Sequence, residues 1–127
     1  MTAGSPLADA LAGFLTAAAD HWAAVRTAAD GTAEPLLREY TDAVSAETDA
    51  TVAVALACAD RAPGYEIAVA RRVRRVTVAA RRAAGRRAGI PTLPAVLVAA
   101  RADLWAAAGW PVSGAAVLSP RAREVAV

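Results

Sequence analysis

Several residue types that often carry chemistry are missing from this sequence or occur only once. It has no lysine, so all 14 basic residues are arginine. This excludes a lysine Schiff base and a phosphate-binding loop lysine. The single cysteine, Cys58, excludes an intrachain disulfide and a multi-cysteine metal site, and we expect it to fill the core. The one histidine, His21, has no glutamate three residues before it, so a di-iron carboxylate bundle is excluded. We expect neither a metal nor a cofactor.

Long apolar runs and aromatic residues are also scarce. Phe, Tyr and Trp make up 5% of the chain, so we expect a thin core of closely packed helices. The longest uncharged stretch, 104–120, contains two prolines and is shorter than the roughly 20 apolar residues that a membrane-spanning helix needs. The first 15 residues lack a basic region, and Asp9 interrupts their apolar run, unlike a secretory signal. We therefore predict no membrane span and a cytoplasmic protein.

Alanine dominates what is present, with 38 of 127 positions, in a chain that is 57% apolar. Alanine has the highest helix propensity, so the expected class is all-α. A chain of this length is typical of one domain. We predict a single helical domain over 1–127, in which 109–127 forms either a short C-terminal helix or a loosely packed extension.

Helix-start and helix-end residues divide the chain into four segments. Ser5 before Pro6 is typical of a helix start, and Gly89 is typical of a helix end. Apolar residues recur at helical spacing between such signals, and short connectors join the segments. The pattern predicts a four-helix up-and-down bundle with helices over about 6–29, 33–61, 65–88 and 93–108.

Charge is divided unevenly between the two halves of the chain. Residues 1–66 contain ten acidic residues and three arginines, a net charge of −7. Residues 67–127 contain eleven arginines and two acidic residues, a net charge of +9. Opposite charges attract, so the halves can neutralise each other within one subunit or between subunits. We expect a homo-oligomer, and an acidic protein is a second possible partner.

The segment from Val69 to Gly89 holds eight arginines in four pairs. Projection at 100° per residue places Tyr65, Val69, Val73, Val76, Ala80, Ala83 and Ala84 on one arc, which we interpret as the core-facing stripe. The opposite face is predicted to be exposed and to bind an anionic surface or a partner; it comprises Arg71, Arg74, Arg75, Arg81, Arg82 and Arg86, with Ile67 and Val78 among them. Exposed apolar residues at such positions indicate contact with another chain.

Two other interpretations of this arginine face stay open. It can be a solvated face balanced by the acidic half of the protein. It can also bind the phosphates of a nucleic acid, since guanidinium groups suit phosphate well. No aromatic residue is interleaved for base stacking, and the net charge of the whole chain is only +2, which makes nucleic-acid binding the weaker alternative.

Polar groups interrupt two of the predicted core stripes. Arg101 falls within the stripe of the fourth helix. Glu47 falls within the stripe of the second helix, whose other members are Leu36, Tyr40, Val44, Thr51, Val54 and Cys58. A buried charge is costly unless it is paired, so we predict an ion pair between Glu47 and Arg101 across the interior. The alternative is a small-molecule or catalytic pocket centred on this pair, with His21, Tyr40 and Thr51 lining it.

The sequence as a whole favours a non-enzymatic assembly module over an enzyme. We predict self-association and partner binding through the arginine-rich helix face. A ligand-binding or catalytic bundle around Glu47 and Arg101, and nucleic-acid binding, are the alternatives.

Overall fold

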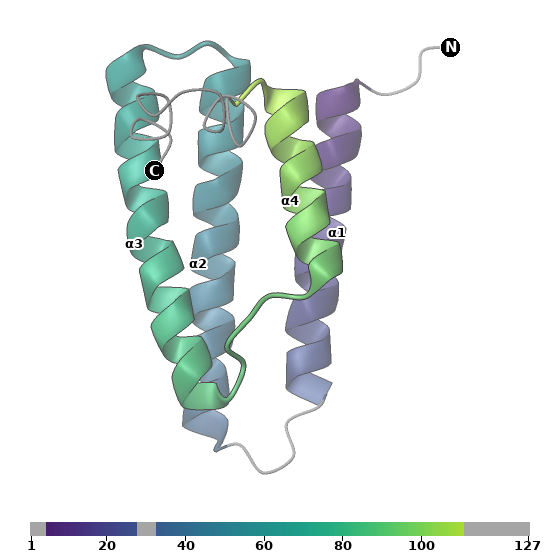
Figure 1. Cartoon of the computed structure of the whole chain (residues 1–127), viewed down its shortest axis with the longest axis vertical. Coiled ribbons are helices and arrows are strands. Elements are labelled where there is room, and N and C mark those ends of the chain that lie inside the picture. Colours follow the sequence, from purple (N-terminus) through teal and green to yellow (C-terminus); the bar gives the residue numbers. More distant parts are fainter. Residues whose placement is uncertain (1–4, 28–32, 111–127) are drawn as a thin grey trace.

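A computed structural model describes residues 5–27 and 33–110 of the chain, and it forms an up-and-down four-helix bundle, as predicted (Figure 1). In these ranges the helices are α1 (Pro6–Thr27), α2 (Glu34–Ala59), α3 (Gly64–Ala88) and α4 (Ala95–Ala108), with no strand. The predicted ends agree within two residues wherever they fall on described residues. Residues 111–127, most of the predicted C-terminal helix or extension, lie outside the described residues.

The helices begin and end where the local sequence requires it. Pro94 precedes α4 with extended backbone angles, and α4 therefore starts two residues later than predicted. Gly89 and Gly109 end α3 and α4 in the left-handed conformation, each with φ of 78°. In α3 the amide of Ile90 donates a 2.6 Å hydrogen bond back to the carbonyl oxygen of Gly85, which satisfies a carbonyl at the helix end.

The four helices are not packed equally around a common axis. α3 packs along α2, α1 packs along α4, and α2 also contacts both α1 and α4, whereas α3 and α4 have no backbone contact. α4 is short and begins about halfway along α1, after a connector that crosses from the lower end of α3 (Figure 1). A gap therefore separates the backbones of α3 and α4, and long side chains are needed to bridge it.

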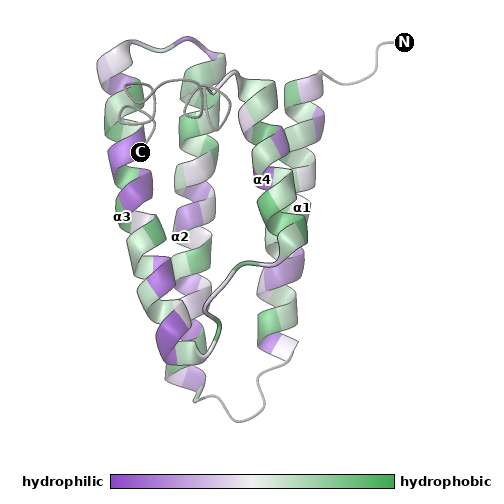
Figure 2. Cartoon of the chain, in the orientation of Figure 1, coloured by the Kyte–Doolittle hydropathy of each residue, from purple (hydrophilic) through white to green (hydrophobic). Residues whose placement is uncertain are grey.

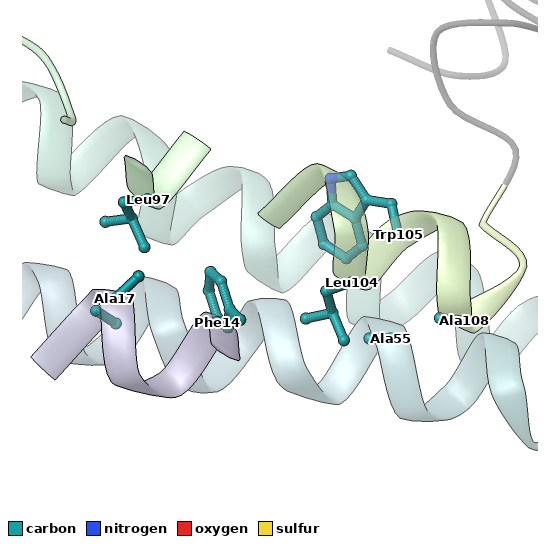
Figure 3. Close-up of a cluster of buried hydrophobic side chains, with 8 residues drawn as sticks. Phe14, Ala17, Ala55, Leu97, Leu104, Trp105 and Ala108 are labelled. Carbon is teal, nitrogen blue, oxygen red and sulfur yellow. The ribbon is translucent and has the colours of Figure 1, made fainter. Parts of the chain in front are cut away.

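The core consists of two apolar clusters at different heights along α2. The upper cluster lies where α4 covers α1 and α2, and Figure 3 shows Phe14 of α1 pointing toward α4 between Leu97 and Leu104. The lower cluster joins α1, α2 and the end of α3; its buried members are Val25, Leu37, Tyr40, Val44, Ala84 and Ala88. Between the clusters, α2 presents the polar side chains of Glu47 and Thr51.

Glycine allows α3 to approach the lower cluster closely. A Cβ atom at Gly85 would overlap the carbonyl oxygen of Ile90 and lie 3.2 Å from Cε1 of Tyr40. A larger residue at this position would force the backbone at Ile90 to move and the Tyr40 ring to shift slightly.

The described helices show no candidate membrane span, because none of them is long and apolar enough to cross a bilayer.

Candidate functional site

The structure corrects the predicted orientation of α3. Tyr65, Val69, Val73 and Val76, interpreted from the sequence as core residues, are 71%, 58%, 52% and 66% exposed. Ala80 of the same predicted stripe is also exposed, whereas Ala83 is half-buried and Ala84 is buried as predicted. The arginine-bearing side instead faces the interior. Its positions repeat every three or four residues: Ile67, Arg71, Arg74, Val78, Arg81, Gly85 and Ala88. Figure 2 shows the resulting mixture of hydrophilic and hydrophobic residues along α3.

The predicted arginine face is therefore split between the interior and the surface. Arg81 is buried and Arg71 and Arg74 are half-buried, whereas Arg75, Arg82 and Arg86 are exposed, as predicted, together with Arg72. Ile67 and Val78 are half-buried beside α2, so the prediction that they are exposed is wrong. The arginine-bearing side of α3 turns inward because a gap separates the backbones of α3 and α4. The long side chain of arginine can span this gap, whereas that of valine cannot.

Glu47 is buried at the centre of the inward arginines, as its position in the stripe of α2 predicts. Its closest partner is Arg81, whose Nε donates a 2.8 Å hydrogen bond to Oε1. Arg101 lies on the other side, with Nη1 4.0 Å from Oε2. The predicted ion pair between Glu47 and Arg101 is therefore present, but sequence reasoning missed Arg81, the stronger partner, because it placed that residue on the outer face.

Arg74 and Arg71 bridge the gap between α3 and α4. The Nε of Arg74 donates a 3.0 Å hydrogen bond to the hydroxyl oxygen of Thr51, and its guanidinium lies 5.0 Å from the ring centre of Trp105. Arg71 lies 5.4 Å from the ring centre of Trp110, which itself packs on Trp105. Cations over indole rings are attracted by the negative charge of the ring face. These contacts link two helices whose backbones do not touch.

The positive charges around Glu47 outnumber its single carboxylate. Burial, followed by the nearby charge of Arg101, lowers the pKa of Arg74 to about 10, although Glu47 acts in the opposite direction. Burial is also the main reason that the pKa of Arg101 is lowered. Glu47 is the only buried acidic residue in the described part of the chain. The cluster around it comprises Arg74, Arg81 and Arg101, and it depends on this carboxylate for neutralisation.

His21 and Tyr40 form a second buried polar pair, next to the first. His21 Nε2 and the Tyr40 hydroxyl are joined by a 2.7 Å hydrogen bond, with the two rings edge to face. Burial, and then the positive charge of Arg81, lowers the pKa of His21. Burial raises the pKa of Tyr40. Both groups are therefore held in their neutral forms at neutral pH.

Protonation of His21 is expected to destabilise the fold. Because the pKa of His21 in the folded state lies below its ordinary value of 6.5, the unfolded chain takes up the proton first as pH falls. The free energy of unfolding should therefore decrease once the pH drops below about 6.5. His21→Gln cannot take up this proton, and its stability should change less over the same range. Thermal unfolding of both proteins from about pH 7.5 to about pH 5.5 tests this; parallel losses would assign the effect to other groups.

The space beside Glu47 is too small for a substrate. It measures about 10 Å³, and its lining includes Glu47, Arg81, Leu97 and Arg101. This is roughly the volume that one water molecule needs. A more open cavity of about 320 Å³ borders His21 at the lower end of the bundle, away from this carboxylate. Of the five candidates, His21, Tyr40, Glu47 and Thr51 are buried and Arg101 is half-buried. Glu47 and Arg101 line the small space and His21 borders the larger one, so neither of these two cavities brings all five together.

We call Glu47, Thr51, Arg74, Arg81 and Arg101 the polar layer; it contains a single carboxylate and neither a thiol nor an imidazole. In the part of the chain that the structure describes, no three His, Cys, Asp or Glu side chains are grouped to bind a metal ion. Cys58 is half-buried at the edge of the upper cluster, and burial raises the pKa of its thiol. A raised pKa disfavours the reactive thiolate. The arrangement can hold charges and fix the register of α3 on α2.

Comparison with known proteins gives no family assignment: no family model, no curated protein and no solved structure matches the chain.

Proposed function

We propose that this protein is a non-enzymatic assembly module that binds its partner through the outer surface of α3. We call this surface the α3 stripe; it comprises Tyr65, Val69, Val73 and Val76. The observation that carries the proposal is their exposure, which ranges from 52% for Val73 to 71% for Tyr65. Large apolar side chains in a continuous line on one helix are typical of a surface that another protein covers.

The inward orientation of the arginines strengthens this proposal. If the α3 stripe were the core face, as its sequence pattern indicates, Arg81 and Glu47 would not meet. The 2.8 Å contact between them fixes the rotation of α3 and leaves the stripe outside. Apolar side chains then face solvent in the isolated chain, and burying them against a partner is favourable by about 25 cal/mol for each square ångström of apolar area.

The exposed arginines beside the stripe favour an acidic partner surface. Arg72 and Arg75 are exposed along one edge of it, and the exposed Arg82 and Arg86 continue this side of α3 beyond Val76. A nucleic acid could neutralise these charges, but it would leave the valines uncovered. Ligand binding or catalysis at Glu47 and Arg101 has less support, because the adjacent space is about 10 Å³.

Substitution of Val73 by aspartate tests the proposed surface. Val73 lies at the middle of the stripe and is half exposed, so the change should leave the fold intact while it places a charge at the centre of the interface. Losing about 2 kcal/mol at such a position weakens association roughly 30-fold. Light scattering over a series of concentrations should show wild-type particles heavier than the 12.9 kDa monomer and a Val73→Asp protein at the monomer mass.

Ala102→Asp is the control, since Ala102 is exposed on α4, away from the stripe and from the arginines beside it. It adds the same charge at an exposed helix position and should associate like the wild type. A wild-type protein that stays monomeric at every concentration, or a Val73→Asp protein that associates normally, would contradict the proposed function.

A further inference from the structure

A groove runs between α1 and α2, apart from the buried polar layer. It measures about 300 Å³, and its α1 side carries Leu15 and Trp22, which are 44% and 41% exposed. Ser45, Thr48 and Asp49 of α2 form the other side, and Ala18 and Val44 form part of the base. The groove is thus apolar along α1 and polar along α2, a shape and chemistry that suit an amphipathic helix.

The α2 side of the groove carries negative charge at regular spacing. Asp42 and Asp49 are both exposed and are seven residues apart, so they lie on the same side of α2. Two helical turns separate them by about 10 Å along the axis. Asp49 lines the groove itself, and Asp42 continues the same edge of the helix.

The α3 stripe has the features that complement this groove. Val69 and Val76 are seven residues apart, as are Leu15 and Trp22 in the groove, so the two apolar rows have the same repeat. The exposed Arg72 borders the stripe, Arg82 and Arg86 extend this positive side of α3 beyond Val76, and the groove is bordered by exposed aspartates. Apolar side would meet apolar side, and positive edge would meet negative edge.

We propose that the α3 stripe of one molecule docks into the α1–α2 groove of a second copy of this chain, so that the molecules join head to tail. This inference rests on the proposed function, because it names the partner of the α3 stripe. The stripe and the groove lie on different helices of one molecule, so each docked molecule still presents one free stripe or one free groove. Contacts of this kind continue until they close into a ring or extend into a filament.

The charges argue against the simpler arrangement, a two-fold dimer of two α3 stripes. Such a dimer would bring the arginine edges of both helices to one interface, where each α3 contributes only one acidic residue, Glu66. Like charges brought together weaken association. In the α1–α2 groove, by contrast, the arginine edge of α3 would meet aspartates instead of a second arginine edge.

Mixing two interface variants distinguishes the two arrangements. Val73→Asp damages the stripe and leaves the groove intact, whereas Ala19→Arg obstructs the groove with a positive side chain and leaves the stripe intact. Ala19 is exposed and lines the groove, so the bundle can accept this change. In the head-to-tail arrangement each variant alone is monomeric. An equimolar mixture forms a 1:1 complex that grows no further, because the remaining stripe and the remaining groove are the damaged ones.

Ala23→Arg is the matched control for the groove variant, because Ala23 is exposed on the same helix but does not line the groove. It should assemble like the wild type, and circular dichroism should show that all variants are folded. If Val73→Asp is monomeric while Ala19→Arg assembles normally, the α3 stripe is an interface and the groove is not its partner. If neither variant changes the mass, both the groove and the proposed function are wrong.

Discussion

Replacing Glu47 by leucine is expected to destabilise the protein by about 3–5 kcal/mol, the usual cost of removing one partner from a buried ion pair. The cost arises from what the change leaves behind. Arg81 is buried and would lose its 2.8 Å contact, and Arg101 would lose the carboxylate 4.0 Å away. Urea unfolding followed by circular dichroism measures the loss.

Two further variants show whether the burial of Glu47 and Arg81 is the reason for this large loss of stability. Glu39→Gln removes an ion pair of similar length, 2.7 Å to Arg87, but both side chains are about half exposed. Its cost should be a small fraction of that for Glu47→Leu, because solvent screens an exposed pair. Adding Arg81→Met to Glu47→Leu should recover much of the loss, since an apolar pair replaces an isolated buried cation. Equal costs for Glu47→Leu and Glu39→Gln would contradict the buried position of Glu47.

The helix ends and the stripe of α2 could be predicted because local chemistry determines them. Gly89 ends α3 as predicted, in a left-handed conformation that glycine adopts without strain. Tyr40, Val44 and Val54 are buried as their spacing indicates, and so is Glu47, the one acidic residue in that stripe. Each of these features depends on residues within a few helical turns, which a sequence pattern records directly.

The rotation of α3 could not be predicted in the same way, because it depends on a neighbour. An apolar arc on a helix normally marks the core face, and Val69, Val73 and Val76 form such an arc. The pattern identifies two distinct faces correctly, but it does not say which of them meets α2. Glu47 and the gap beside the short helix α4 decide this, and they favour a face that carries Arg74 and Arg81. The sequence contains one signal for the rotation of α3. Glu47 lies in the core stripe of α2, and a buried carboxylate requires cations on the helix that faces it.

Trp105 is the second residue whose loss should have a large effect, because it is the point where α3 and α4 meet. The side chain is 7% exposed, packs in the upper cluster and contacts Trp110, with ring centres 4.1 Å apart. The guanidinium of Arg74 lies over the Trp105 ring, 5.0 Å from the ring centre. Trp105→Ala should destabilise the protein by about 3–5 kcal/mol, as is usual for a buried tryptophan.

Val96→Ala is the control, because Val96 lies on the same helix as Trp105 but is 73% exposed. Surface substitutions usually change stability by less than about 0.5 kcal/mol, so this control should unfold close to the wild type. A double-mutant cycle of Trp105→Leu with Arg74→Met then isolates the link between the helices, with an expected coupling of about 0.5–2 kcal/mol. A coupling of zero would mean that Arg74 does not link Trp105 to α3, and the contact of Arg71 with Trp110 would then be the remaining bridge between these helices.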